Sequence, residues 1–147
     1  MPKAERRAEV TWEGNLTEGH GTIASTSSGA LKNMPITWAS RVERPDGKTS
    51  PEELLAAAHA ECYAMSLSHT LAQGGTPAEM LNVSAVCTIE IGASGPKIRS
   101  VDLNVRGKVA GLDEAGLEKA AQAAEQSCPV SNALRNNVSI SVKTQLV

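Results

Sequence analysis

Residues 50–73 read SPEELLAAAHAECYAMSLSHTLAQ, and this segment sets the architecture of the chain. Ser50 suits an N-cap, Pro51 suits the first helical position, and Glu53 completes a capping box, so a helix is predicted to begin at Pro51. The helix should run to the Gly74–Gly75 pair, which makes it about 22 residues and roughly 33 Å long. Since the radius of gyration expected for this chain length is about 15 Å, the helix must cross the whole domain.

Apolar side chains lie on every side of this predicted helix, and many of them are alanines. They are Leu54, Leu55, Ala56, Ala57, Ala58, Ala60, Ala64, Met65, Leu67 and Leu71. A helix with no clean polar face is typical of a buried helix, and small alanines allow other elements to approach closely. Because a monomer of 147 residues could hardly cover both sides of such a helix, we expect a homodimer that shares its core.

The segments on either side of this helix have the patterns of strands and shorter helices. The stretch from Glu9 to Ser40 is broken repeatedly by Gly and Pro, which predicts hairpins in a small sheet, and residues 43–49 form a charged turn. After the long helix we expect two alternating strands at 83–91 and 101–109 joined by a hairpin turn, an Ala-rich helix at 113–127, a short helix opened by Cys128 and Pro129, and a closing strand at 138–143. This order predicts an α+β fold with antiparallel strands, formed as a single domain over residues 1–147.

Composition argues against several classes of protein. The chain has 147 residues, a formal net charge of -2 and a pI near 5.9, so it has no global positive field that would attract nucleic acid. Its aromatic residues are Trp12, Trp38 and Tyr63, which cannot build a base-stacking platform or a membrane belt. No apolar run is long enough for a membrane helix, and the first residues lack the apolar core of a signal peptide, so we expect a cytoplasmic protein.

The three cysteines, Cys62, Cys87 and Cys128, differ in their surroundings. An odd number in a reducing compartment favours a transient, chemical disulfide over a structural one. Cys87 lies in the apolar phase of its predicted strand and is interpreted as a structural core residue. Cys62 lies near the middle of the long helix on a stripe with Ala58 and Met65, where periodicity alone fits a small core residue as well as a nucleophile.

A catalytic Cys62 would have to ionise in surroundings that oppose ionisation. Burial raises the pKa of a thiol, and the helix dipole fades within the first turn, whereas Cys62 lies about three turns into the helix. A nearby cation is therefore needed, but no Lys or Arg occurs between Lys48 and Lys97, so the cation must come from another element. A unit charge about 4 Å away contributes about 4 kcal/mol at an effective dielectric of 20, or about three pKa units, which is sufficient.

Cys128 has a different local context, because Pro129 follows it directly. Pro is favoured at a first helical position, which puts Cys128 at or beside an N-cap, where backbone N–H groups and the helix dipole favour a thiolate. Cys62 and Cys128 could form a resolving pair, or they could be two unrelated thiols.

Three other functions stay open on the residues alone. His59 lies three positions before Cys62 and is its neighbour on the helix, which allows a Cys-His hydrolase or acyl transferase; no helix start beside Cys62 supplies an oxyanion hole for it, and Cys128 would have no part in it. A metal site from His59, Cys62, His69 and Cys128 is the second alternative, although His69 lies roughly 10 Å along the helix axis. The third is a catalytically silent dimeric scaffold or small-ligand-binding protein with inert thiols.

Two motifs resemble those of the OsmC/Ohr family of thiol-dependent peroxidases. They are PEELLAAAHAEC at residues 51–62 and CPVS at residues 128–131. Residues 21–23 (GTI) and 38–41 (WASR) are similar to the amino-terminal hairpins and the arginine strand of that family. The resemblance covers essentially the whole chain, and the position of Arg41 just before the charged turn is similar to the OsmC branch.

The resemblance implies an intertwined homodimer with long central helices and peroxidase activity towards organic hydroperoxides, with hydrogen peroxide as a second candidate substrate. It casts Cys62 as the peroxidatic cysteine and Cys128 as the resolving cysteine, and it assigns Arg41 and Glu52 as the paired charges that activate Cys62. Arg41 would supply the cation that the long helix lacks, and Glu52 would orient it. An external dithiol would reduce the Cys62–Cys128 disulfide, and no metal, haem or flavin cofactor is required.

Overall fold

The computed structural model describes residues 1–147, which divide into two compact units, Met1–Pro51 and Glu52–Val147. Each unit has its own three-stranded sheet, with strand order β1-β2-β3 in the first and β4-β5-β6 in the second. The single domain expected over residues 1–147 stays a prediction. No helix is both long enough and apolar enough to span a membrane.

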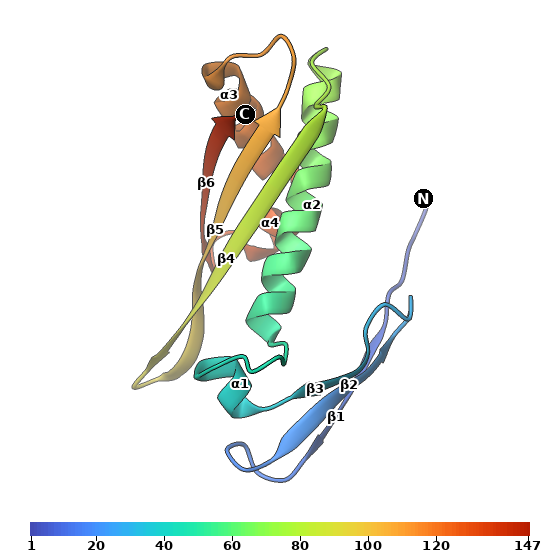
Figure 1. The fold of residues 1–147 in the computed structure, drawn as a ribbon, viewed down its shortest axis with the longest axis vertical. Coiled ribbons are helices and arrows are strands. Elements are labelled where there is room, and N and C mark those ends of the chain that lie inside the picture. Colours follow the sequence, from blue (N-terminus) through green and yellow to red (C-terminus); the bar gives the residue numbers. More distant parts are fainter. The chain divides into compact units, whose positions relative to one another are not determined.

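The first unit is an antiparallel sheet followed by a short helix (Figure 1). Its strands are β1 (Ala8–Glu13), β2 (His20–Thr26) and β3 (Lys32–Ile36). β1 and β2 approach each other closely at Gly21, because a Cβ there would come within 2.7 Å of the Trp12 ring and 2.8 Å of the Thr11 carbonyl oxygen. The predicted hairpins of a small sheet are confirmed by the pairing of β1 with β2 and of β2 with β3.

The segment that carries Arg41 is a helix, α1 (Trp38–Val42), and the strand that the family resemblance predicted there is wrong. Thr37 is the N-cap of α1: its Oγ1 accepts the backbone N–H of Ser40 at 3.0 Å, and Ser40 Oγ accepts the backbone N–H of Thr37 at 3.1 Å. This capping box stabilises the first turn and ends the extended backbone of β3. Arg41 consequently lies in the last turn of a helix.

The second unit begins with the long helix and places it beside a mixed sheet (Figure 1). Its elements are α2 (Pro51–Gln73), β4 (Met80–Gly92), β5 (Gly95–Lys108), α3 (Glu114–Ser127), α4 (Pro129–Leu134) and β6 (Ser139–Leu146). The predicted long helix, strand hairpin, Ala-rich helix, short helix and closing strand are all confirmed. The observed strands are longer than the ranges predicted from the alternating pattern. Asp113 caps α3, because its side chain accepts the N–H of Gly116 at 2.7 Å.

One strand pairing departs from the antiparallel expectation. β4 pairs with β5 antiparallel, as do the strands of the first unit, but β5 pairs with β6 parallel, from Ser100 opposite Ser139 to Gly107 opposite Leu146. A parallel pair requires a crossover connection, and α3 and α4 supply it. The alternating pattern of β6 predicts which of its side chains face the core. It does not show whether β6 runs parallel or antiparallel to β5.

The core of the second unit lies between α2, α3 and one face of the sheet. Val101, Leu103 and Val105 of β5 are buried at alternate positions, as the period of a strand requires. From the helices, the buried apolar residues that join this cluster are Tyr63, Leu67, Leu71, Leu117 and Ala124. The sheet therefore presents an apolar face to the helices and a polar face on the other side.

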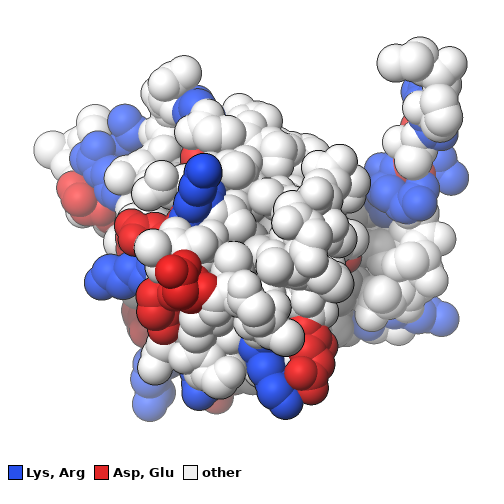
Figure 2. Space-filling view, turned by 90° about the horizontal axis from the view of Figure 1, so that it is seen from above, with Lys and Arg blue, Asp and Glu red and all other residues white.

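Within one chain, α2 is buried along one face only. Its buried residues are Glu52, His59, Tyr63, Leu67 and Leu71. Met65 is 60% exposed, and the exposed positions beside it include Ala57 and Ala58. The homodimer stays a prediction, and this uncovered apolar face is the surface that it would cover. In Figure 2, charged side chains of both signs are interspersed, with a wide area between them that carries no Lys, Arg, Asp or Glu.

Candidate active site

Cys62 and Cys128 lie side by side in the second unit. Their Sγ atoms are 3.5 Å apart, although the residues are 66 positions apart in the sequence. Cys62 is half-buried in the middle of α2, and Cys128 is fully buried between α3 and α4. A disulfide has an S–S distance of about 2.0 Å, so the two sulfur atoms are close to bonding distance but not bonded. The structure thus brings together the two cysteines that the sequence singled out.

The position of Cys128 follows from the local sequence. Cys128 ends α3, where its backbone N–H donates to the Ala124 carbonyl oxygen at 2.8 Å, and it is also the N-cap of α4, with Pro129 at the first helical position. Its backbone is extended, with φ −67° and ψ 118°, as an N-cap requires. Cys128 Sγ accepts the backbone N–H of Ser131 at 3.5 Å. The sulfur therefore takes the place of the oxygen of a Ser or Asp cap, as the sequence predicted.

The two thiols have pKa values that move in opposite directions. Burial raises the pKa of Cys62, with smaller increases from Cys128 and Glu61, and a backbone hydrogen bond from Val130 opposes them. Burial also acts to raise the pKa of Cys128, but hydrogen bonds from the Ser131 backbone and side chain, from Cys62 and from the Val130 backbone outweigh it, so that the pKa of Cys128 lies below its usual value.

His59 belongs to the Cys128 side of the site rather than to Cys62. Its ring is fully buried, its Nε2 lies 2.7 Å from Ser131 Oγ, and its Nδ1 has no hydrogen-bond partner. Burial lowers the pKa of His59 and outweighs the opposing charge of Glu125, so the ring is neutral at pH 7. Neither ring nitrogen bonds to Cys62, and the Cys-His pair of the hydrolase alternative is not formed.

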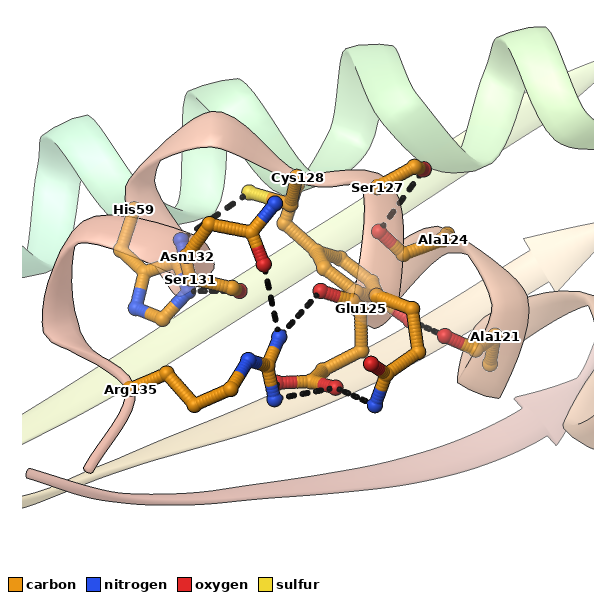
Figure 3. A network of polar contacts seen from close by, with 11 residues as sticks. His59, Ala121, Ala124, Glu125, Ser127, Cys128, Ser131, Asn132 and Arg135 are labelled. Carbon is orange, nitrogen blue, oxygen red and sulfur yellow. Dashed lines mark hydrogen bonds and ion pairs between the residues drawn. The ribbon is translucent and has the colours of Figure 1, made fainter.

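A wider network holds the segment around Cys128 in place (Figure 3). Arg135 donates to the Glu125 carboxylate at 2.8 and 3.1 Å, to the Glu125 carbonyl oxygen at 3.0 Å and to Asn132 Oδ1 at 3.0 Å. Tyr63 of α2 donates its hydroxyl to the Ala121 carbonyl oxygen of α3 at 2.7 Å. These contacts tie α2, α3 and α4 together around the two sulfur atoms.

The sequence reasoning assigned no role to the residues of this network. Ser131 carried one usable signal, because it stands three positions after the predicted N-cap Cys128, where a backbone N–H and a side chain both face the capping atom. Glu125, Arg135 and Tyr63 carried none, because their partners lie on other elements. From the sequence, His59 was considered only as a partner of Cys62 or a metal ligand, whereas the structure places its ring inside the core with one nitrogen unpaired.

Arg41 and Glu52 lie in different units of the chain. The Arg41 guanidinium lies 5.7 Å from the centre of the Trp38 ring, and Arg41 lines a cavity of about 300 Å³ in the first unit together with Trp12 and Leu16. Glu52 is in the first turn of α2 and is buried, with 6% of its surface exposed. Their roles at Cys62 stay predictions.

The remaining candidates are less informative. Cys87 of β4 is half-buried and packs against the core, as expected for a structural cysteine, and burial raises its pKa. His69 is exposed on α2. No three His, Cys, Asp or Glu side chains converge as metal ligands.

Comparison with known proteins gives consistent matches. The family model described as OsmC-like protein matches residues 44–143. Peroxiredoxin OsmC of Escherichia coli is 33% identical over 135 residues, which cover 92% of this chain and 93% of that protein. Organic hydroperoxide resistance protein-like 1 of Staphylococcus epidermidis is 32% identical over 108 residues, which cover 71% of this chain and 76% of that protein.

A solved structure gives the same result for the fold. The organic hydroperoxide resistance protein OhrB of Bacillus subtilis superimposes with a TM-score of 0.74 at 26% identity, and the match covers 95% of this chain and 98% of that one. The α+β fold predicted from the sequence is confirmed, and so is the resemblance carried by the two cysteine motifs.

Proposed function

Because this chain belongs to the OsmC-like protein family, we propose that it is a cysteine-based peroxidase that reduces organic hydroperoxides through Cys62 and Cys128. The observation that carries the proposal is the 3.5 Å separation of the two Sγ atoms. Two thiols at this distance are close enough for one sulfur to attack the other once it has been oxidised. The similar proteins named for organic hydroperoxide resistance support the same class of substrate.

The reaction has three steps. The Cys62 thiolate attacks the outer oxygen of the hydroperoxide, which leaves a sulfenic acid on Cys62 and releases the alcohol. The Cys128 thiolate then attacks the Cys62 sulfur, forms the Cys62–Cys128 disulfide and displaces hydroxide, which takes a proton and leaves as water. An external dithiol reduces the disulfide and is itself oxidised to a disulfide.

Arg41 is our candidate for the cation that ionises Cys62, and Glu52 for the carboxylate that orients it. Burial raises the pKa of Cys62, and within the second unit only the Val130 N–H opposes this. A guanidinium that reaches the sulfur would lower the pKa and could also donate to the peroxide oxygens and the departing alkoxide. Arg41 lines an apolar cavity with Trp12 and Leu16, a setting that suits a substrate with an apolar group.

We also propose that the protein acts as a homodimer in the cytoplasm. The exposed face of α2 carries Met65 and several alanines, and a second copy of the chain would cover it. The three cysteines are free thiols, which suits a reducing compartment.

The test is to treat the reduced protein with one equivalent of cumene hydroperoxide or hydrogen peroxide and to map disulfides by mass spectrometry of peptides. We expect one intramolecular bridge, between Cys62 and Cys128, and rapid peroxide consumption by stopped flow. Cys87→Ser is the matched control and should behave as wild type. Consumption no faster than that of a free thiol, or a bridge that involves Cys87, would contradict the proposal.

A further inference from the structure

A second contact joins α2 to α4 beside the two cysteines, and the peroxidase reaction as written does not use it. His59 Nε2 lies 2.7 Å from Ser131 Oγ, although the two residues are 72 positions apart in the sequence. His59 precedes Cys62 by three positions on α2, and Ser131 follows Cys128 by three positions at the start of α4. Residues three apart on a helix are neighbours, so the two helices meet along two adjacent contacts, one between sulfur atoms and one between polar side chains. In Figure 3, His59 lies beside Ser131, close to Cys128.

The polar contact is buried at a cost. His59 and Ser131 are both fully buried, and His59 Nδ1 has no hydrogen-bond partner. An unpaired buried polar atom lowers stability, and an apolar side chain at position 59 would avoid that loss. Folding stability alone therefore does not explain a histidine at this position.

α4 depends on tertiary contacts for its position. It has six residues, and a helix of that length is not stable by itself in water. Its end is held by Arg135, which is the C-cap and donates to Glu125 of α3. Its start is held against α2 by Ser131, whose side chain contacts His59 and whose backbone N–H donates to Cys128 Sγ at 3.5 Å. The residue that contacts His59 is thus also the one that orients the sulfur of Cys128.

We propose that His59 positions Cys128 for the resolving step: through Ser131 it holds the start of α4 against α2, with the Cys128 sulfur within reach of Cys62, and so sets the rate of disulfide formation. This inference rests on the proposed peroxidase function. Reacting atoms in a near-attack arrangement are about 3–3.5 Å apart, and a displacement of about 1 Å can cost a factor of about 100 in rate. The two sulfur atoms are 3.5 Å apart, so the step is sensitive to small shifts of α4.

His59 takes no proton or electron in this step. The Cys128 thiolate bonds to Cys62 Sγ with its electron pair, the S–O bond of the sulfenic acid breaks, and the hydroxide that leaves takes a proton and becomes water. His59 Nε2 contacts Ser131 Oγ, and Nδ1 contacts no polar atom. His59 therefore acts through Ser131 and is a positioning residue, whereas Cys62 and Cys128 carry the chemistry.

The arrangement is complete within the second unit of one chain. His59, Ser131 and Cys128 all lie in Glu52–Val147 and are fully buried there. It therefore depends neither on the cation that ionises Cys62 nor on a second copy that would cover the exposed face of α2.

The first experiment measures closure of the disulfide without peroxide. Reduced Cys87→Ser protein receives one equivalent of methyl methanethiosulfonate, which leaves a methylthio group on one sulfur. Attack by the other sulfur forms the Cys62–Cys128 bond and releases methanethiolate, and mass spectrometry of the acid-quenched protein follows the loss of the methylthio group. We expect His59→Leu and Ser131→Ala each to slow closure about tenfold, the effect of one hydrogen bond. The double variant should be no slower than either, because both residues act through one contact.

Three controls separate positioning from a general loss of structure. His59→Gln should restore closure, because its amide can donate or accept at a similar reach. Ser127→Ala is the matched control and should leave closure unchanged, because the Ser127 hydroxyl donates to the Ala124 carbonyl oxygen. In a Cys128→Ser background, His59→Leu should not change the alkylation rate of Cys62.

The inference is overturned by a wild-type closure rate in Ser131→Ala or His59→Leu with native circular dichroism, by equal slowing in Ser127→Ala, or by effects that multiply in the double variant. Where His59→Leu does not fold, Ser131→Ala, the smaller change, decides the result.

The second experiment separates this inference from the proposed function. With one equivalent of cumene hydroperoxide, His59→Leu and Ser131→Ala should consume peroxide at the wild-type rate but form the disulfide about tenfold more slowly, so that dimedone traps more sulfenic acid on Cys62. Wild type that consumes no peroxide, with closure as expected, contradicts the proposed function alone. Rapid peroxide consumption with a wild-type closure rate in both variants overturns only this inference.

Discussion

Cys62 and Cys128 are the same residue type, separated by 3.5 Å, in sites of opposite character. Cys62 lies in the middle of a helix, where every backbone N–H is already used within the helix, and burial raises its pKa. Cys128 lies at a helix start, where free N–H groups and the Ser131 hydroxyl lower its pKa despite deeper burial. Burial acts to raise the pKa of both thiols, and the number of hydrogen bonds that each sulfur receives sets the net direction.

The largest expected effect comes from removing either sulfur. Cys62→Ser should abolish peroxide consumption, because it removes the proposed peroxidatic sulfur and leaves Cys128 without its partner thiol. Cys128→Ser should still consume one equivalent of peroxide and then stop with a sulfenic acid on Cys62. Dimedone labelling of Cys62 checks this. Equal residual activity in the two variants would show that the two sulfurs are not functionally distinct.

The next effect concerns the cation that Cys62 lacks in its own unit. In a Cys87→Ser, Cys128→Ser background, Arg41→Ala should slow alkylation of Cys62 at pH 7 by at least about tenfold, one pKa unit, with circular dichroism unchanged. Arg44→Ala, three residues further on, is the matched control and should leave the rate unchanged. An unchanged rate in Arg41→Ala would remove Arg41 from the mechanism and require another source of ionisation.

The third effect is a dependence of folding stability on pH, caused by the buried ring of His59. Because burial lowers the pKa of His59 below its unfolded value, the unfolded state binds more protons as the pH falls below about 6.5, and the folded state loses stability. We expect wild type to be less stable to urea at pH 5 than at pH 7, with a His59 contribution of at most about 1.4 kcal/mol per pH unit.

The control for this prediction is a second histidine. His59→Gln should flatten the pH dependence relative to wild type, whereas His69→Gln, at an exposed position of α2, should not. The same slope in His59→Gln and wild type would mean that the buried ring titrates as it does in water.

The smallest effect is expected at the outer end of the network. Arg135→Gln removes the ion pair with Glu125 and should destabilise the protein by about 1 kcal/mol, since Arg135 is partly exposed and its pair is screened by water. Urea unfolding at pH 7 measures this. We expect disulfide formation to slow only slightly, and Lys119→Gln, on α3, to have no effect on either quantity. A loss as large as that of a core deletion would mean that Arg135 holds α4 in place by itself.

Much of the fold follows from local signals. Pro51 and the glycines after Gln73 bound α2, Asp113 begins α3, and Pro129 places Cys128 at the start of α4. These signals act within one turn of helix, so the sequence contains all the information that they need. The segment Trp38–Arg41 was predicted to be a strand but is helical, because Thr37 and Ser40 form a capping box that starts a helix there.

Other features depend on contacts between distant segments. The parallel direction of β6 requires the α3–α4 crossover, and the His59–Ser131 contact joins residues 72 positions apart. The sequence by itself determined the helices after residue 50, the alternating strands, the N-cap position of Cys128 and the lack of a cation near Cys62 along the chain. Only the tertiary structure decided that the two sulfurs meet and that a buried neutral histidine stands behind one of them, because packing of α2 against α3 and α4, and no local preference, sets those distances.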